Sequence, residues 1–234
     1  MTQLILSDYE IESATVRLYK SGIFGIEEDP KNFRNLKHER KSPHYFDIRK
    51  GVSSFETRQL IGGMVNKLVQ RRATSVSGQG KHYDHFVGVP EAMTTYVVTA
   101  ADNERKSQLQ IRANKQKTSG NKTPIMGEYK TGDRIALFED AITSGKSTID
   151  EIDNVQAEGL IVEDVFVMVD RQEGGSETIR QQTGVDVIAG LAVAQMVDLL
   201  RAEELISETQ RDNVAEYLGQ YGEPRAKAVF GVNT

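Results

Sequence analysis

The sequence predicts an α/β fold in which helices flank a central parallel sheet. Two observations lead to this prediction. Apolar runs of strand length alternate with segments of helical periodicity, and 234 residues are enough for one large core. No internal repeat is found. We therefore treat the chain as one structural unit.

The expected elements follow one another with polar or glycine-containing connections between them. The first helix is expected at residues 8–20, where Ile11 and Leu18 lie on or near one face. A charged connection is expected at 22–41, and a mobile, lysine-rich loop at 113–123. Strands are expected at 43–49, 85–90, 108–112, 134–138, 162–169 and 185–189. Further helices are expected at 55–70, 94–101, 147–157, 178–182, 191–202 and 207–220.

Composition excludes several classes of protein. The formal net charge is −5 and 38% of residues are hydrophobic, which is ordinary for a globular protein and indicates neither a nucleic acid nor a membrane as partner. There is no cysteine, so disulfides and thiolate chemistry are excluded, and the four histidines lack the spacing of a zinc site. No secretory signal and no membrane-spanning apolar run is found, so we expect a cytoplasmic location.

The segment FEDAITSGKST, residues 138–148, contains Gly-Lys-Ser, which also ends the phosphate loop of many nucleotide-binding proteins. That loop needs a glycine five residues before its second glycine, Gly145. Here the position holds Asp140, whose charge would face the phosphates. We therefore interpret this partial match as accidental.

The same segment predicts a different anion site. An apolar strand is expected to bring Glu139 and Asp140 to its tip, and Thr143, Gly145 and Ser147 follow at the start of a helix. Free N–H groups and the helix dipole favour a phosphate there. The two acids can hold sugar hydroxyls, so the pattern indicates a phosphorylated ribose as ligand.

Three separated motifs resemble a known family. Residues 135–147, IALFEDAITSGKS, resemble the signature of the type I phosphoribosyltransferases, which bind 5-phosphoribosyl-1-diphosphate (PRPP). Residues 36–47, LKHERKSPHYFD, and residues 170–174, DRQEG, resemble two segments of orotate phosphoribosyltransferase. The resemblance covers roughly residues 33–220. It implies a type I phosphoribosyltransferase fold with a small N-terminal hood.

The resemblance also implies a division of the chain. Residues 1–52 would form an N-terminal helix and hood, 53–205 the phosphoribosyltransferase core, and 206–234 a C-terminal helix and tail. The implied activity is transfer of the phosphoribosyl group from PRPP to orotate, which gives orotidine 5′-monophosphate and diphosphate in de novo pyrimidine (UMP) biosynthesis.

Residue roles carry over position by position. The implied catalytic residues are Lys117, Glu139 and Asp140. PRPP would be bound by Glu139, Asp140, Ala141, Ile142, Thr143, Ser144, Gly145, Lys146, Ser147, Glu91 and Ala92. Orotate would be bound by Lys37, Tyr45, Phe46, Thr143 and Arg171, with Arg171 pairing with its carboxylate. Magnesium would be held mainly by PRPP, with no direct protein ligands. A homodimer is implied, because the loop that carries Lys117 closes over the partner's site.

The chain departs from the family pattern on the diphosphate side. Ala113, Asn114 and Ser119 replace two basic residues and an aromatic or histidine, and Glu91 stands where relatives have an aromatic residue. Two alternatives therefore stay open: a type I phosphoribosyltransferase for another base, and a PRPP-binding regulator without turnover.

Plainer interpretations of the single residues also stay open. The acidic pair could be ordinary polar residues at a strand end, and Lys117 a solvated charge. Arg171 could be a surface salt-bridge partner. One of Tyr45 and Phe46 could pack in the core, because they point to opposite faces of a strand.

Overall fold

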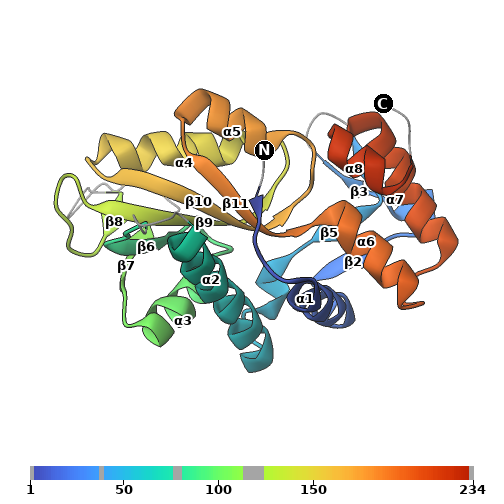
Figure 1. The fold of residues 1–234 in the computed structure, drawn as a ribbon, viewed down its shortest axis with the longest axis horizontal. Helices are drawn as coiled ribbons and strands as arrows, with labels where there is room; N and C mark the ends of the chain where they lie inside the picture. The colour runs from blue at the N-terminus through green and yellow to red at the C-terminus, as the bar shows by residue number, and fades with distance from the viewer. Residues whose placement is uncertain (1–2, 37–39, 76–80, 113–123, 232–234) are drawn as a thin grey trace.

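The fold is built on one seven-stranded sheet with helices on both faces (Figure 1). The computed structural model describes residues 3–36, 40–75, 81–112 and 124–231. The strand order is β1-β11-β10-β9-β6-β7-β8, and all neighbours pair in parallel except β8, which runs antiparallel to β7. The strands are β1 Gln3–Leu4, β6 His85–Gly88, β7 Ser107–Ile111, β8 Ile125–Met126, β9 Arg134–Ile142, β10 Ile161–Asp170 and β11 Asp186–Ala192.

Helices α4 and α5 cover one face of the sheet, and α2 and α3 cover the other (Figure 1). Alternation along β9 decides which side chains meet which helices, because successive side chains of a strand point to opposite faces. Ile135 and Leu137 join the core beneath α4 and α5, whereas Ala136 and Phe138 join the core beneath α2 and α3. The helices are α1 Asp8–Lys20, α2 Phe55–Ser75, α3 Thr94–Glu104, α4 Lys146–Ala157, α5 Gly175–Thr183, α6 Val193–Ala202, α7 Glu208–Tyr221 and α8 Pro224–Val229.

Most of the predicted elements are confirmed, and α1 has the predicted bounds. Its start is fixed by a capping box, in which the Ser7 hydroxyl accepts from the Glu10 backbone N–H and the Glu10 carboxylate accepts from the Ser7 backbone N–H. Helix α7 begins in the same way after Ser207. Strand β1, strand β8 and helix α8 were not predicted.

Two predicted boundaries are wrong for the same reason. Strand β9 does not end at residue 138 but continues to Ile142, so Glu139 and Asp140 lie inside the strand. Strand β11 continues to Ala192, into the expected start of a helix. In both cases pairing with β10 extends the strand: Glu139 lies opposite Val167, and Leu191 opposite Val169. The residue pattern within one segment carries no information about the strand that will pair with it.

The predicted charged connection at 22–41 is also partly wrong. It contains β2 Phe24–Ile26 and β3 Arg34–Asn35, which pair antiparallel with β5 His44–Phe46 and β4 Lys41–Ser42. A 3₁₀ helix, Ile48–Gly51, replaces the end of the strand expected at 43–49. These two small ribbons form the structure that we call the hood. Strands of two or three residues are too short to produce a recognisable alternation.

One large core cluster joins residues from the hood, the sheet and the C-terminal helices, among them Phe24, Phe138 and Leu218. The predicted division at residues 52 and 205 stays a prediction. Among the described residues, no helix is long and apolar enough to cross a membrane.

The aromatic centre of the sheet provides a stability prediction. The Phe166 ring is fully buried, stacks on Phe138 at 5.2 Å between centroids, and meets Tyr83 edge-on at 5.8 Å. Phe166→Ala should lower the free energy of unfolding by about 3–5 kcal/mol, because it leaves a cavity. The matched control is Phe55→Ala, since Phe55 is 61% exposed, and it should change stability by only about 0.5 kcal/mol. Urea unfolding measures both, and equal losses would contradict this account.

Candidate active site

The acidic pair lies at the carboxyl end of β9. Glu139 is buried, and one of its carboxylate oxygens accepts a hydrogen bond from the Thr148 hydroxyl of α4 at 3.2 Å. Burial first, and then the nearby charge of Asp140, raise the pKa of Glu139 to about 8. Asp140 is half-buried and accepts from the Ala141 backbone N–H at 2.8 Å. The pair therefore holds one constrained and one more accessible acid.

The loop after β9 is held in shape by two glycines. Gly145 has a φ of +79°, which favours glycine, and it begins α4. A Cβ at Gly145 would lie 2.7 Å from the Gly175 carbonyl oxygen. A Cβ at Gly175 would overlap the Thr143 carbonyl oxygen. The first turn of α5 and the loop therefore fit only because neither residue has a side chain.

This loop lines a cavity of about 310 Å³. The cavity brings together seven of the predicted PRPP-binding residues, 141–147, and adds Thr148. Its other wall comes from the hood through Leu36 and Arg40. Backbone N–H groups at the start of α4 are suited to an anion, so the cavity fits a phosphate. Glu139 and Asp140 precede the cavity along the chain and do not line it.

Arg171 lies beneath the hood, next to this loop. Its backbone N–H donates to the carbonyl of Ile142 at 3.1 Å, which joins the end of β10 to the start of the loop. Its guanidinium donates to the Ser42 hydroxyl at 3.0 Å and forms an ion pair with Glu173 at 3.2 Å. The residue is only 8% exposed, and its Nε has no hydrogen-bond partner among the described residues. It is not the surface ion pair considered above.

Glu173 contacts several of the polar groups around Arg171. Its carboxylate also forms an ion pair with Arg40 at 3.2 Å and accepts from the Tyr217 hydroxyl at 3.1 Å. Burial and the charge of Glu173 raise the pKa of Tyr217 to about 12. His44 lies edge-on to Tyr217, and burial together with the charge of Arg171 holds its pKa well below the usual value. His44 is therefore neutral, and the cluster has two guanidinium charges against one carboxylate.

The predicted base-covering aromatics, Tyr45 and Phe46, have contacts of their own. The Tyr45 ring covers Gly25, with the Arg34 guanidinium 4.6 Å and the Lys50 ammonium 4.8 Å from its centroid. Phe46 packs against the large core. Neither side chain lines the 310 Å³ cavity. Their contact with the base stays a prediction.

Of the residues predicted to lie on the diphosphate side, Glu91 is exposed and Ala92 is buried, and the Pro90–Glu91 peptide bond is cis. The structure adds Arg49 to this region. Its guanidinium pairs with Asp47 at 2.9 Å, and Asp47 first, then Asp140 and Glu91, raise the pKa of Arg49. Arg49 was not predicted as a site residue, although it lies two residues after the motif at 36–47. Lys37 and Lys117 lie outside the described residues.

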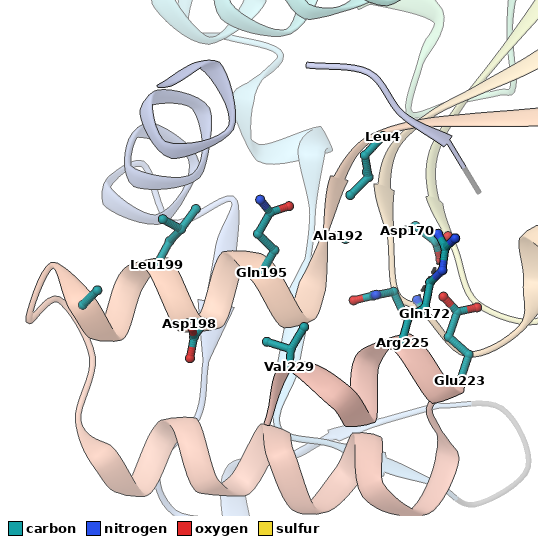
Figure 2. A pocket seen from close by; sticks show the side chains of 11 residues that line it. Leu4, Asp170, Gln172, Ala192, Gln195, Asp198, Leu199, Glu223, Arg225 and Val229 are labelled. Carbon is teal, nitrogen blue, oxygen red and sulfur yellow. Dashed lines mark hydrogen bonds between the residues drawn. The ribbon is translucent and has the colours of Figure 1, made fainter. Parts of the chain in front are cut away.

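A second cavity, of about 500 Å³, is lined by Asp170 and Gln172, the two chain neighbours of Arg171 (Figure 2). Asp170 and Gln172 lie at one end of this cavity with Glu223 and Arg225, and Gln195, Asp198 and Leu199 lie toward the other end (Figure 2). Asp170 accepts from the Gln172 backbone N–H and the Ser176 hydroxyl, at 2.7 and 2.9 Å. None of the predicted site residues lines this cavity.

The described residues contain no group of three or more His, Asp or Glu side chains arranged to hold a metal ion. The acids near the loop are Glu139 and Asp140, one of them held by Thr148. Carboxylate oxygens are ligands that suit magnesium, so this donor set fits a magnesium ion that a bound diphosphate would carry in.

Comparison with known proteins decides the family. No protein-family model matches the chain. The orotate phosphoribosyltransferase of Methanocaldococcus jannaschii is 30% identical over 157 residues, which cover 67% of this chain and 82% of that protein. The chain belongs to the orotate phosphoribosyltransferase family. It is equally similar, at 30% over 183 residues, to the uridine 5′-monophosphate synthase of Caenorhabditis elegans, but spans only 35% of that longer relative.

Solved structures agree with this family. The UMP synthase of Leishmania donovani matches with a TM-score of 0.77 and 23% identity, over 90% of this chain and 42% of that one. The orotate phosphoribosyltransferase of Aeropyrum pernix matches with a TM-score of 0.64 and 19% identity, over 82% of this chain and 99% of that one. These likenesses confirm the predicted type I phosphoribosyltransferase fold.

The raised pKa of Glu139 predicts a pH dependence of stability. Its pKa is about 8 in the folded chain against an ordinary value of 4.5. The folded state therefore retains a proton that the unfolded state releases, and this stabilisation, complete below the ordinary value, is lost as pH rises through about 8. Glu139→Gln stays neutral at every pH. At about pH 9 it should exceed the wild type in free energy of unfolding by at least about 1 kcal/mol, the equivalent of one pKa unit.

Urea unfolding at about pH 6 and about pH 9 measures this difference. The control is Asp150→Asn, an exposed position on the same helix as Thr148, which should follow the wild type at both pH values. Parallel pH profiles for Glu139→Gln and the wild type would contradict the assignment.

Proposed function

We propose that this chain catalyses transfer of the 5-phosphoribosyl group from PRPP to orotate, giving orotidine 5′-monophosphate and diphosphate in de novo pyrimidine biosynthesis. Its family is one of pentosyltransferases. The single observation that carries the choice of base is Arg171: a buried guanidinium with an unpartnered Nε, one backbone hydrogen bond away from the phosphate loop.

The charge balance beneath the hood supports a carboxylate-bearing base. Arg171 and Arg40 share Glu173, and His44 is neutral, so the cluster has one uncompensated positive charge. Buried charges need partners, because leaving water without one costs several kcal/mol per ion. Orotate carries a carboxylate, and a planar guanidinium can bind it bidentately. A purine lacks that group.

The phosphate loop and the acids suit PRPP. The segment Thr143–Ser147 would wrap the 5′-phosphate, and Ala141 and Ile142 would complete the wall of the cavity. Glu139 and Asp140 would hold the ribose hydroxyls. As diphosphate leaves the anomeric carbon, positive charge develops on the ribose ring, and fixed carboxylates beside it lower the barrier. Because Glu139 is easily protonated, Asp140 provides most of this charge at neutral pH.

Magnesium, when bound to PRPP, would neutralise the leaving diphosphate. The chain's own contribution on that side would come from Glu91 and Ala92 near the cis peptide bond, with Lys117 delivered by the neighbouring subunit. Lys37, Tyr45 and Phe46 would enclose the base from the hood. The homodimer and the cytoplasmic location belong to the same proposal and are supported by the resemblance and by composition.

The test of the base uses Arg171. Consumption of orotate with PRPP and magnesium is followed by absorbance, and Arg171→Ala should lower kcat/KM for orotate by about 100-fold, since a charge-assisted pair is lost. Arg171→Lys should be intermediate, because lysine keeps the charge but not the planar fork. The control Arg180→Ala removes a 50% exposed arginine of α5 and should leave the rate unchanged. Turnover of another base in preference to orotate would refute the choice. PRPP binding without any turnover would favour the regulatory alternative.

A second test addresses the shared active site. Lys117→Ala and Asp140→Asn should each reduce turnover strongly, one through the diphosphate and the other through the ribose. Refolded as an equal mixture, they should regain about a quarter of the wild-type activity, because half of the dimers are mixed and each of these holds one intact site. The two variants assayed without refolding together are the control. No regain in the mixture would contradict a lid that crosses between subunits.

A further inference from the structure

Arg40 occupies a fixed position in the hood. Its backbone carbonyl accepts from the Leu36 N–H at 2.7 Å, and the neighbouring residues Asn35 and Lys41 pair across the β3–β4 ribbon. The hood is attached to the body of the protein by Phe24 and by the adjoining Ile48, both fully buried in the large core cluster. The start of the Arg40 side chain is therefore held in place by the fold.

The Arg40 side chain is held from two sides. Its guanidinium forms an ion pair with Glu173 at 3.2 Å and lies over the Tyr221 ring at 5.1 Å from the centroid. Glu173 also contacts Arg171 and Tyr217, so its single negative charge is not available to Arg40 only. A guanidinium has more N–H donors than one carboxylate oxygen can use. Part of the hydrogen-bonding capacity of Arg40 is therefore available to a ligand.

Arg40 also faces the phosphate loop. Together with Leu36 it forms the hood wall of the 310 Å³ cavity whose opposite wall is residues 141–148. Among the described residues, the side chains that line this cavity include two basic ones, Arg40 and Lys146, and no acidic one. Backbone N–H groups of the loop and the Arg40 side chain of the hood thus border the same cavity.

We propose that Arg40 is the hood residue that closes the 5′-phosphate subsite, by donating hydrogen bonds to the phosphate from the side opposite the loop. The inference rests on the proposed function for the identity of the ligand as a ribose 5-phosphate group. Glu173 and the Tyr221 ring position the guanidinium. Because the same Glu173 holds Arg171, the phosphate and base subsites share one carboxylate as their common support.

The test measures binding of ribose 5-phosphate by titration calorimetry, without orotate or turnover. Arg40→Ala should weaken this binding by about tenfold or more, since a charge-assisted contact to the phosphate is lost, while orotate affinity changes by less than about threefold. Arg40→Lys should recover part of the loss, because it restores the charge without the bidentate geometry. The matched control is Lys41→Ala, an exposed cation of the same ribbon, which should leave both affinities unchanged.

If Arg40→Ala fails to fold, Arg40→Gln gives the same comparison, because it keeps a group that can bond Glu173 and removes the charge. Unchanged affinity for ribose 5-phosphate in these variants would overturn the proposal, as would a loss confined to orotate or a wild-type chain that does not bind ribose 5-phosphate. Failure of the proposed function has a different result: the wild type would bind ribose 5-phosphate in an Arg40-dependent way and yet consume no orotate.

Discussion

The parallel pairing of β9 with β10 is the constraint on which the rest of the site depends. It places Ile142 opposite Asp170, so the loop that follows β9 and the segment that follows β10 begin side by side. The hydrogen bond from the Arg171 N–H to the Ile142 carbonyl and the contact between Gly145 and Gly175 follow from this register. The predicted phosphate loop and Arg171, which we propose binds the base, are therefore positioned by one strand pair, although about 30 residues separate them along the chain.

The site is built from charges that have been partly removed from water. Glu139 is buried next to Asp140, and Arg171 is buried next to Glu173 and a neutral histidine. Burial alone would disfavour each of these charged forms, and their neighbours only partly offset it. A ligand that brings a positive centre near Glu139 and a carboxylate near Arg171 would offset the cost of burying each of these two charges. This is the physical reason why an orotate and PRPP pair suits the site better than a neutral base.

The chemistry of the loop could be predicted from sequence because it is local. Glu139, Asp140, Thr143 and Gly145 are contiguous, and a strand followed by a glycine-containing helix start places them without knowledge of the rest of the fold. The hood could not be predicted in the same way. Its strands are only two or three residues long, and its partners come from segments that the sequence suggests are irregular. Arg40, Glu173 and Tyr217 were therefore missed as one cluster, although Glu173 stood within a quoted motif.

The sequence by itself determined the alternation of helices and strands, the acidic pair with the loop predicted to bind phosphate, and Arg171 as a candidate for the base, because each depends on residues close together in the chain. Only the tertiary structure decided where β9 and β11 end, that Arg171 is buried with an unpartnered Nε, and that Arg40 faces the phosphate loop. These features depend on contacts between separate segments, such as β9 and β11 with β10, and Ser42 with Arg171, which lie 129 residues apart. Burial and hydrogen-bond partners are properties of such contacts, so no local pattern contains them.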